Sequence, residues 1–353
     1  MMAEALRLAR KGLWTAEPNP RVGCVIAHGE QVVGRGWHAR TGGPHAEVGA
    51  LAEAGQEARG ATAYINLEPC SHHGRTPPCA DALIEAGVAR VVCAMRDPHP
   101  SVAGEGMRRL KAAGVEVECG LMHGQAQDLN RGFVSRIERK RPFVRAKLAG
   151  SLDARTSGPD GESKWITGEA ARRDGHRWRA RAGAVLTGIE TVLADDPALD
   201  VRLADFEKKP LVVVADSRAR LPATAKLLAT GAPVMQACIR DDAPVPAGCE
   251  RAVLPSGPDG RVALGALLSL LAERGINELH VEAGPVLTGA LLCQGLVDEL
   301  LVYQAPCIIG ADGAAMLRLP GVEKLDQRLQ FKVLERRVVG RDIRLRLAPA
   351  GGR

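Results

Sequence analysis

Residues 43–47 of this chain read Gly-Pro-His-Ala-Glu, and residues 68–79 read Glu-Pro-Cys-Ser-His-His-Gly-Arg-Thr-Pro-Pro-Cys. In these two stretches, His45, Cys70 and Cys79 supply one imidazole and two thiolates, which are preferred ligands of zinc. Three protein ligands leave the fourth position of a tetrahedral zinc ion to water, as a catalytic site requires. The two stretches therefore predict a catalytic zinc centre.

Glu47 lies two residues after the histidine and is not a ligand in this arrangement. We expect it to move protons between the water, a ring nitrogen of the substrate and the leaving ammonia. A His-x-Glu followed by Pro-Cys and a second cysteine is typical of zinc-dependent base deaminases. A structural zinc site is the alternative, and its fourth protein ligand would be His72, His73 or Cys24.

The local sequence predicts how the chain delivers these ligands. Pro44 suits the first turn of a helix over 45–51, and residues 64–67 predict a strand that leads to Cys70. The second ligand cysteine opens a predicted helix over 80–85, where the helix dipole favours a thiolate. Strand and helix ends therefore meet at the predicted metal.

Length and composition favour a two-domain protein of the cytosol. The chain has 353 residues, which is long for one core. No apolar run reaches membrane-spanning length, and residues 1–11 predict an amphipathic helix rather than a signal peptide. Nine scattered cysteines, an odd number, fit a reducing compartment better than a disulfide framework.

The net charge of +6 is compatible with anionic small substrates and with nucleic acid. Only 3% of the residues are aromatic, and proteins that bind single strands stack bases on aromatic side chains. Composition therefore argues against a nucleic-acid partner, and no membrane partner is expected.

Strands and helices alternate in the first half of the chain, which favours an α/β sandwich. Beyond the segments at the metal, we predict a helix over 106–113 and strands over 21–27, 31–37, 89–95 and 115–119.

The pattern changes near residue 120. We expect a first domain over 1–120, a charged connector over 121–142 that ends in Glu-Arg-Lys-Arg-Pro, and a second α/β domain over 143–353. In the second domain, apolar runs predict strands over 143–149, 184–187, 211–215, 278–281 and 299–303.

Functional signals in the second half are weaker. Residues 282–290 form a glycine-bearing turn that follows a predicted strand and opens a helix, and a helix N-terminus of this kind can bind phosphate. Asp195 and Asp196 precede a proline, where adjacent carboxylates usually cap a turn. Proton donation is the second interpretation of this pair.

Eight residues separate the two ligand cysteines, including His72 and Arg75. Because arginine is a good phosphate ligand, we expect this loop to contact a substrate phosphate, with an ordinary exposed loop as the alternative. Asn19 and His38 are expected to recognise the edge of the base, unless they serve only in turns.

Motifs over nearly the whole chain resemble the family of bacterial bifunctional riboflavin-biosynthesis deaminase–reductases. The long loop between the cysteines is specific to this group among zinc deaminases. The matching stretches are residues 18–26, 44–47, 67–79, 97–100, 151–153, 163–167, 191–197 and 281–285.

The resemblance implies an α/β protein with an N-terminal cytidine-deaminase-like three-layer domain and a C-terminal dihydrofolate-reductase-like domain. The first would remove the 2-amino group of 2,5-diamino-6-(5-phosphoribosylamino)pyrimidin-4-one by hydrolysis. The second would use NADPH to reduce the ribosyl group of the resulting uracil to ribityl. A homo-oligomer, with a dimer favoured, is expected.

The resemblance also assigns roles in the second half. Asp195 or Glu282 would protonate the opening sugar, and Arg218 would help select the 2′-phosphate of NADPH. The positions implied to contact the cofactor are Ala149, Trp165, Thr191, Asp195, Ser217, Gly284, Pro285, Val286, Leu287, Thr288, Gly289 and Ala290. Those implied to contact the substrate are Lys147, Ser163, Arg179, Leu199, Arg202 and Glu282, and the two arginines among them would hold its phosphate.

Two other functions compete with this one. A deaminase acting on a tRNA or nucleotide base would use the basic second half to bind nucleic acid. A non-enzymatic zinc module would show four protein ligands around its metal.

Overall fold

The computed structural model describes residues 1–71, 77–100, 102–204 and 206–351. It divides into two compact units, Met1–Arg141 and Pro142–Arg353. Within the described residues, every helix is too short or too polar to cross a lipid bilayer. Each unit has its own sheet and core.

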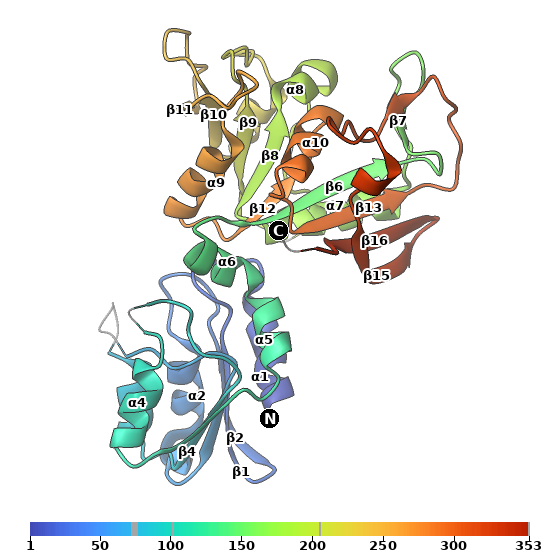
Figure 1. Ribbon diagram of the computed structural model, residues 1–353. Coiled ribbons are helices and arrows are strands. Elements are labelled where there is room, and N and C mark those ends of the chain that lie inside the picture. Colours follow the sequence, from blue (N-terminus) through green and yellow to red (C-terminus); the bar gives the residue numbers. More distant parts are fainter. Residues whose placement is uncertain (72–76, 101, 205, 352–353) are drawn as a thin grey trace. The chain divides into compact units, whose positions relative to one another are not determined.

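The first unit is a five-stranded sheet between two layers of helices (Figure 1). The strand order is β2-β1-β3-β4-β5, with β1 antiparallel to both neighbours and the β3, β4 and β5 strands parallel. The strands are β1 (Gly23–His28), β2 (Gln31–Trp37), β3 (Thr62–Ile65), β4 (Arg90–Cys93) and β5 (Glu116–Cys119). The helices are α1 (Met2–Ala9), α2 (Ala46–Ala54), α3 (Cys79–Glu85), α4 (Glu105–Ala112), α5 (His123–Leu129) and α6 (Arg131–Arg139).

Alternating side chains of β1 supply both cores of this unit. Ile26 faces the core formed with α2, α3 and α4, whereas Val25 faces the core formed with α1, α5 and α6. Glycines let α2 approach β2 closely, because a Cβ at Gly36 would lie 2.0 Å from the carbonyl oxygen of Ala46. This contact fixes the start of α2, directly after His45.

The second unit is built on a nine-stranded sheet in the order β11-β10-β9-β8-β12-β6-β13-β16-β15. All neighbours are parallel except the β13–β16 and β16–β15 pairs. Its strands are β6 (Phe143–Gly150), β8 (Ala184–Gly188), β9 (Leu211–Ala215), β10 (Val234–Cys238), β11 (Cys249–Val253), β12 (Glu278–Val281), β13 (Glu299–Gln304), β15 (Phe331–Val339) and β16 (Asp342–Pro349). A separate ladder pairs β7 (Arg155–Ser157) with β14 (Ala314–Ala315).

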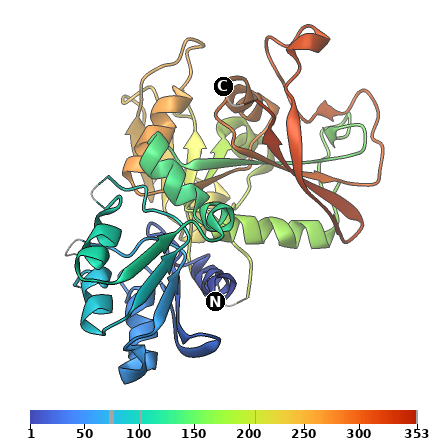
Figure 2. The same ribbon diagram turned by 60° about the horizontal axis from the view of Figure 1, so that its bottom comes forward.

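Four helices cover this sheet. Those against the larger apolar core are α9 (Leu264–Glu273) and α10 (Pro285–Cys293), and those on the other face are α7 (Glu169–Arg181) and α8 (Ile189–Asp195). Figure 2 shows α7, in light green, lying along the sheet. Ion pairs join it to the sheet, since Asp174 binds Arg344 and Arg181 binds Glu278, each at 2.7 Å, and the guanidinium of the fully buried Arg145 on β6 lies 4.5 Å from the centre of the Trp178 ring.

The strands and helices predicted from the sequence are present, and their ends differ from the predicted ones by no more than three residues. Pro44 precedes α2 instead of entering its first turn, since His45 is the N-cap residue. The prediction that residues 121–142 form a connector is wrong. This segment contains α5 and α6, whose Ala126, Leu129 and Val134 are buried in the first unit. Their buried apolar side chains are separated by charged residues along each helix, so the sequence does not show that these helices pack against the first unit.

Candidate active sites

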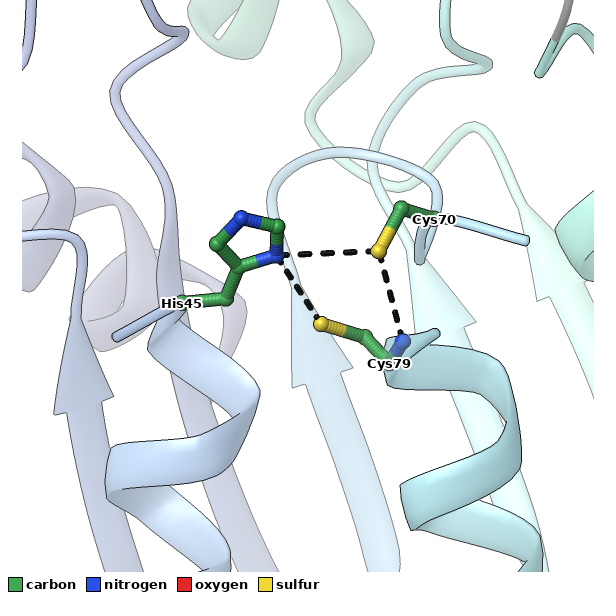
Figure 3. Close-up of side chains that lie close together, drawn as sticks. All are labelled: His45, Cys70 and Cys79. Atoms are coloured by element: carbon green, nitrogen blue, oxygen red, sulfur yellow. Dashed lines mark hydrogen bonds between the residues drawn. The ribbon is translucent and has the colours of Figure 1, made fainter. Parts of the chain in front are cut away.

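The predicted zinc ligands meet in the first unit. The Nδ1 atom of His45 lies 3.1 Å from Sγ of Cys79 and 3.6 Å from Sγ of Cys70, and the three ligand atoms lie within 4.8 Å of one another. Figure 3 shows the imidazole and both thiols converging on one point. Two ligands placed tetrahedrally around zinc at about 2.1 and 2.3 Å are about 3.6 Å apart, so this donor set fits zinc.

Three element ends create this convergence. His45 is the N-cap of α2, Cys79 is the first residue of α3, and Cys70 lies in the loop after β3. The backbone N–H of Cys79 donates to Sγ of Cys70 at 3.3 Å (Figure 3). A bond of this kind favours the thiolate that a metal requires. Among the described residues, Cys24 is not a member of the cluster, while His72 and His73 lie outside them.

The pKa values of two groups at the site are shifted by their surroundings. Hydrogen bonding with Cys79 lowers the pKa of the Cys70 thiol to about 4. Burial raises the pKa of Glu47 to about 7, and the charge on Cys70 adds to this rise. Only 4% of Glu47 is exposed, so its carboxyl group is shielded from bulk solvent.

A cavity of about 280 Å³ opens beside the ligands. Asn19 and His38 line it, together with His45, Glu47 and Cys70. The Asn19 amide lies 3.1 Å from Nε2 of His38, whose Nδ1 lies 3.0 Å from the carbonyl oxygen of Pro44. His72 and Arg75, the other residues predicted to contact substrate, lie outside the described residues.

Sequence reasoning gave no role to four residues that line the same cavity: Glu68, Asp97, His99 and Phe133. Three of them lie in stretches quoted for the family resemblance, which was the available signal. Phe133 belongs to α6, within the segment expected to be a connector, and no sequence signal pointed to it.

The second unit brings together another group of predicted residues. The carboxylate of Glu282 accepts two bonds from the Arg179 guanidinium, one of them at 3.0 Å, and Nζ of Lys147 lies 3.3 Å away. Nε2 of the fully buried His280 lies 3.4 Å from the same carboxylate. Burial opposes ionisation here, but the charges on Arg179 and Lys147 hold the pKa of Glu282 well below its usual range.

Several residues predicted to contact the cofactor lie at the carboxyl ends of parallel strands. Ala149 is near the end of β6, Ser217 follows β9, and the Gly284 turn follows β12. Oγ1 of Thr191 accepts a bond from the Gly284 N–H at 3.1 Å, and α10 then begins at Pro285 and carries the rest of the predicted 285–290 segment. The carboxyl edge of a parallel sheet is the usual place for a nucleotide, and a helix N-terminus suits its phosphates.

The remaining predicted residues are more dispersed. Asp195 ends α8 with an exposed side chain, and Arg218 is also exposed. Leu199 is buried, whereas Arg202 is exposed and lies 3.5 Å from Asp200. Ser163 and Trp165 line an open hollow on the loop before α7.

Comparison with known proteins matches both units. Residues 1–95 match the cytidine and deoxycytidylate deaminase zinc-binding region, and residues 142–345 match the RibD C-terminal domain. The riboflavin biosynthesis protein RibD of Escherichia coli is 47% identical over 361 residues, covering 99% of this chain and 98% of that protein.

Solved structures also resemble the whole chain. RibD of Acinetobacter baumannii is 44% identical with a TM-score of 0.91, covering 99% of this chain and 98% of that one. A diaminohydroxyphosphoribosylaminopyrimidine deaminase/5-amino-6-(5-phosphoribosylamino)uracil reductase from Thermotoga maritima is 32% identical with a TM-score of 0.90, covering 99% and 97%. The similarity therefore extends over both units.

Proposed function

Because this chain belongs to the RibD family of riboflavin-biosynthesis deaminase–reductases, we propose that it catalyses two consecutive steps on one phosphorylated pyrimidine. The first unit, with its zinc-binding site, removes the 2-amino group of 2,5-diamino-6-(5-phosphoribosylamino)pyrimidin-4-one as ammonia. The second unit, a reductase domain with a dihydrofolate-reductase-like fold, reduces the resulting ribosylaminouracil to the ribityl compound with NADPH.

The observation that carries the deaminase proposal is the three-ligand cluster beside a buried carboxyl group in one cavity. His45, Cys70 and Cys79 would hold the zinc ion, which would supply activated water at neutral pH. Glu47 would carry one proton of the attacking water to the ring nitrogen, and then the second proton, from the hydroxyl group on the attacked carbon, to the amino group. A carbon–oxygen bond replaces the carbon–nitrogen bond, and ammonia leaves.

The rest of the cavity recognises the pyrimidine. The amide of Asn19 and the imidazole of His38 form a polar pair on its wall, and both types of group hydrogen-bond to the edge of a base. We assign the substrate phosphate to His72 and Arg75, because arginine binds phosphate in two-point contacts.

In the reductase unit, bound NADPH would supply the hydride. The predicted contact residues at the strand ends, together with the N-terminus of α10, support binding of its phosphates. Arg218 follows the same strand as Ser217 and is exposed, which supports a contact with the 2′-phosphate that distinguishes NADPH from NADH.

The surroundings of Asp195 and Glu282 indicate which of them protonates the opening sugar. Glu282 is held ionised by Arg179 and Lys147, so it accepts hydrogen bonds from the sugar hydroxyls and does not donate a proton. Asp195 is exposed at the end of α8 and is therefore our candidate for protonating the opening ribose. Arg179 is held by two bonds to Glu282, whereas Arg202 is exposed and its contact with Asp200 is longer at 3.5 Å, so Arg202 is the better candidate for the substrate phosphate.

Incubating the purified chain with the diaminopyrimidine phosphate tests this function. We expect ammonia and the ribosylaminouracil without a nicotinamide cofactor, and the ribityl product when NADPH is added. NADH should replace NADPH poorly. Absence of ammonia release by zinc-loaded protein, or equal use of the two cofactors, would contradict the proposal.

We further propose a cytoplasmic homodimer. Its support is β15, an edge strand of the nine-stranded sheet that exposes Val333 and Val338, because such edges favour pairing with another chain. Light scattering should give about twice the 37.4 kDa chain mass, and a monomer at micromolar concentration would contradict it.

A further inference from the structure

Glu68 connects two segments of the first unit that are distant in sequence. It lies two residues before Cys70, and only 3% of it is exposed. Oε2 of its carboxylate accepts the backbone N–H groups of Asp97 at 3.1 Å and Gly104 at 2.9 Å. Oε1 accepts the N–H of Met107 at 3.2 Å. Both oxygens are therefore bound by the backbone around the start of α4.

This carboxylate replaces a helix cap that the local sequence does not provide. The N-cap residue of α4 is Gly104, which has no side chain and adopts a φ of 86°. The first N–H groups of a helix need acceptors, and a negative charge is favourable there. Glu68 meets both needs from outside the helix, so the start of α4 depends on a residue near the metal.

The segment held in this way forms one wall of the substrate cavity. Asp97, His99 and Val102 line the cavity, as does Glu68 itself. Oδ1 of Asp97 accepts the N–H of His99 at 2.7 Å, which continues the connection along the wall. The packing leaves little freedom, since a Cβ at Gly106 would lie 1.9 Å from the carbonyl oxygen of Pro69.

We propose that Glu68 is a positioning residue of the deaminase site: it sets the wall containing Asp97 and His99 at the distance from the zinc ligands that fits the substrate. This inference rests on the proposed function. Glu68 does not take part in the proton transfers, because the backbone occupies both of its oxygens. Its removal should weaken substrate binding while the metal and Glu47 remain in place.

The test compares Glu68→Gln and Glu68→Ala with Glu105→Gln in the full zinc-loaded chain. Glu105 is the matched control, because it is an acid in the first turn of α4 that pairs with Arg108 outside the cavity. Losing one charge-assisted bond corresponds to about a tenfold change. We therefore expect KM for deamination to rise about tenfold in Glu68→Gln and further in Glu68→Ala, with kcat within about threefold.

Two readouts separate positioning from general damage. Zinc content should stay at one per chain, and the amides of Asp97, Gly104 and Met107 should exchange hydrogen about tenfold faster than in Glu105→Gln. An unchanged KM in folded variants, or loss of zinc or of the fold in both of them, would overturn the proposal. The exchange measurement does not require activity. Unchanged exchange would therefore overturn the positioning role of Glu68 even if the unaltered chain failed to deaminate. Failure of the unaltered chain to deaminate would contradict the proposed function separately.

Discussion

The metal site is built from three ligand side chains, His45, Cys70 and Cys79. Cys70 provides one of two sulfur ligands, and its oxygen analogue is a poor ligand for zinc. We expect Cys70→Ser to lose most of its zinc and all measurable deamination. Cys307→Ser is the control, because Cys307 is an exposed thiol of the other unit. Metal analysis of the two purified variants checks the prediction, and full zinc retention in Cys70→Ser would contradict it.

Glu282 should make a stability contribution that depends on pH. Its folded pKa lies below the unfolded value of about 4.3, so the stabilisation is present above that value and is lost as the pH falls through the folded pKa. Glu282→Gln leaves Arg179 and Lys147 without their counter-charge, which should cost about 3–5 kcal/mol at pH 7.

Urea unfolding between pH 7 and pH 3 measures this effect. The free energies of unfolding of the unaltered chain and Glu282→Gln should converge as the pH falls. Glu273→Gln, at an exposed position of α9, should run parallel to the unaltered chain. A gap that widens towards low pH would show that Glu282 is not held ionised.

At the scale of single residues, the sequence identified the metal ligands but not Glu68, which positions the wall of the cavity beside them. His45, Cys70 and Cys79 are the residue types that zinc requires, and their order is enough to identify them. The role of Glu68 depends on backbone N–H groups about 30 to 40 positions away. No local pattern encodes such a contact, because any buried acid could serve as the acceptor.

Between elements, the position of α2 determines where His45 and Glu47 lie. A Cβ at Gly36 would lie 2.0 Å from the oxygen of Ala46 and 2.5 Å from the nitrogen of Ala50. Gly36→Ala should therefore displace the start of α2, lower the free energy of unfolding by about 1–3 kcal/mol and reduce zinc affinity.

Gly124→Ala provides the comparison, because a Cβ at Gly124 meets nothing within 4 Å and the residue lies in α5. This variant should be neutral or slightly stabilised, since alanine is the better helix former. Thermal unfolding and zinc titration measure both effects. A Gly36→Ala protein with unchanged zinc affinity would show that α2 can move without disturbing the ligands.

Strands made of apolar runs could be predicted from the sequence, but a helix that packs through charged side chains could not. Apolar runs identified β9 and β12 at their observed bounds, whereas β10, β11, β15 and β16 of the same sheet were not predicted. Helix α7 gave no such signal, because its 13 residues include five arginines. Its sheet-facing side contributes Asp174 and Arg181 to ion pairs. A helix that packs through charges cannot be recognised by an apolar stripe.

At the scale of the whole molecule, each unit has its own sheet and core. The zinc ligands and Glu47 belong to the first unit, and all predicted reductase residues belong to the second. The sequence predicted this division because each half shows its own alternation of strands and helices. It misplaced the end of the first unit because α5 and α6 combine buried apolar positions with many charges.

This division predicts that the two activities can be lost separately. Glu47→Gln keeps the shape of the side chain but cannot accept a proton, so deamination should fall by about 10²–10⁴-fold. Reduction of added ribosylaminouracil by NADPH should stay within about twofold of the unaltered chain. Asp195→Asn should do the reverse: it changes an exposed side chain, so the fold should survive, and the deaminated ribosyl intermediate should accumulate.

Mixing the two variants completes the test. If the intermediate diffuses between molecules, Glu47→Gln and Asp195→Asn together should restore the ribityl product that neither forms alone. Chromatography of the products, with ammonia release and NADPH oxidation followed in parallel, shows whether the mixture forms the ribityl product and which step each variant has lost. A folded Glu47→Gln protein that had also lost reduction of the deaminated substrate would contradict two independent sites. It would mean that Glu47 serves both reactions, although it lies in the unit that holds the zinc ligands and not in the unit that holds Glu282.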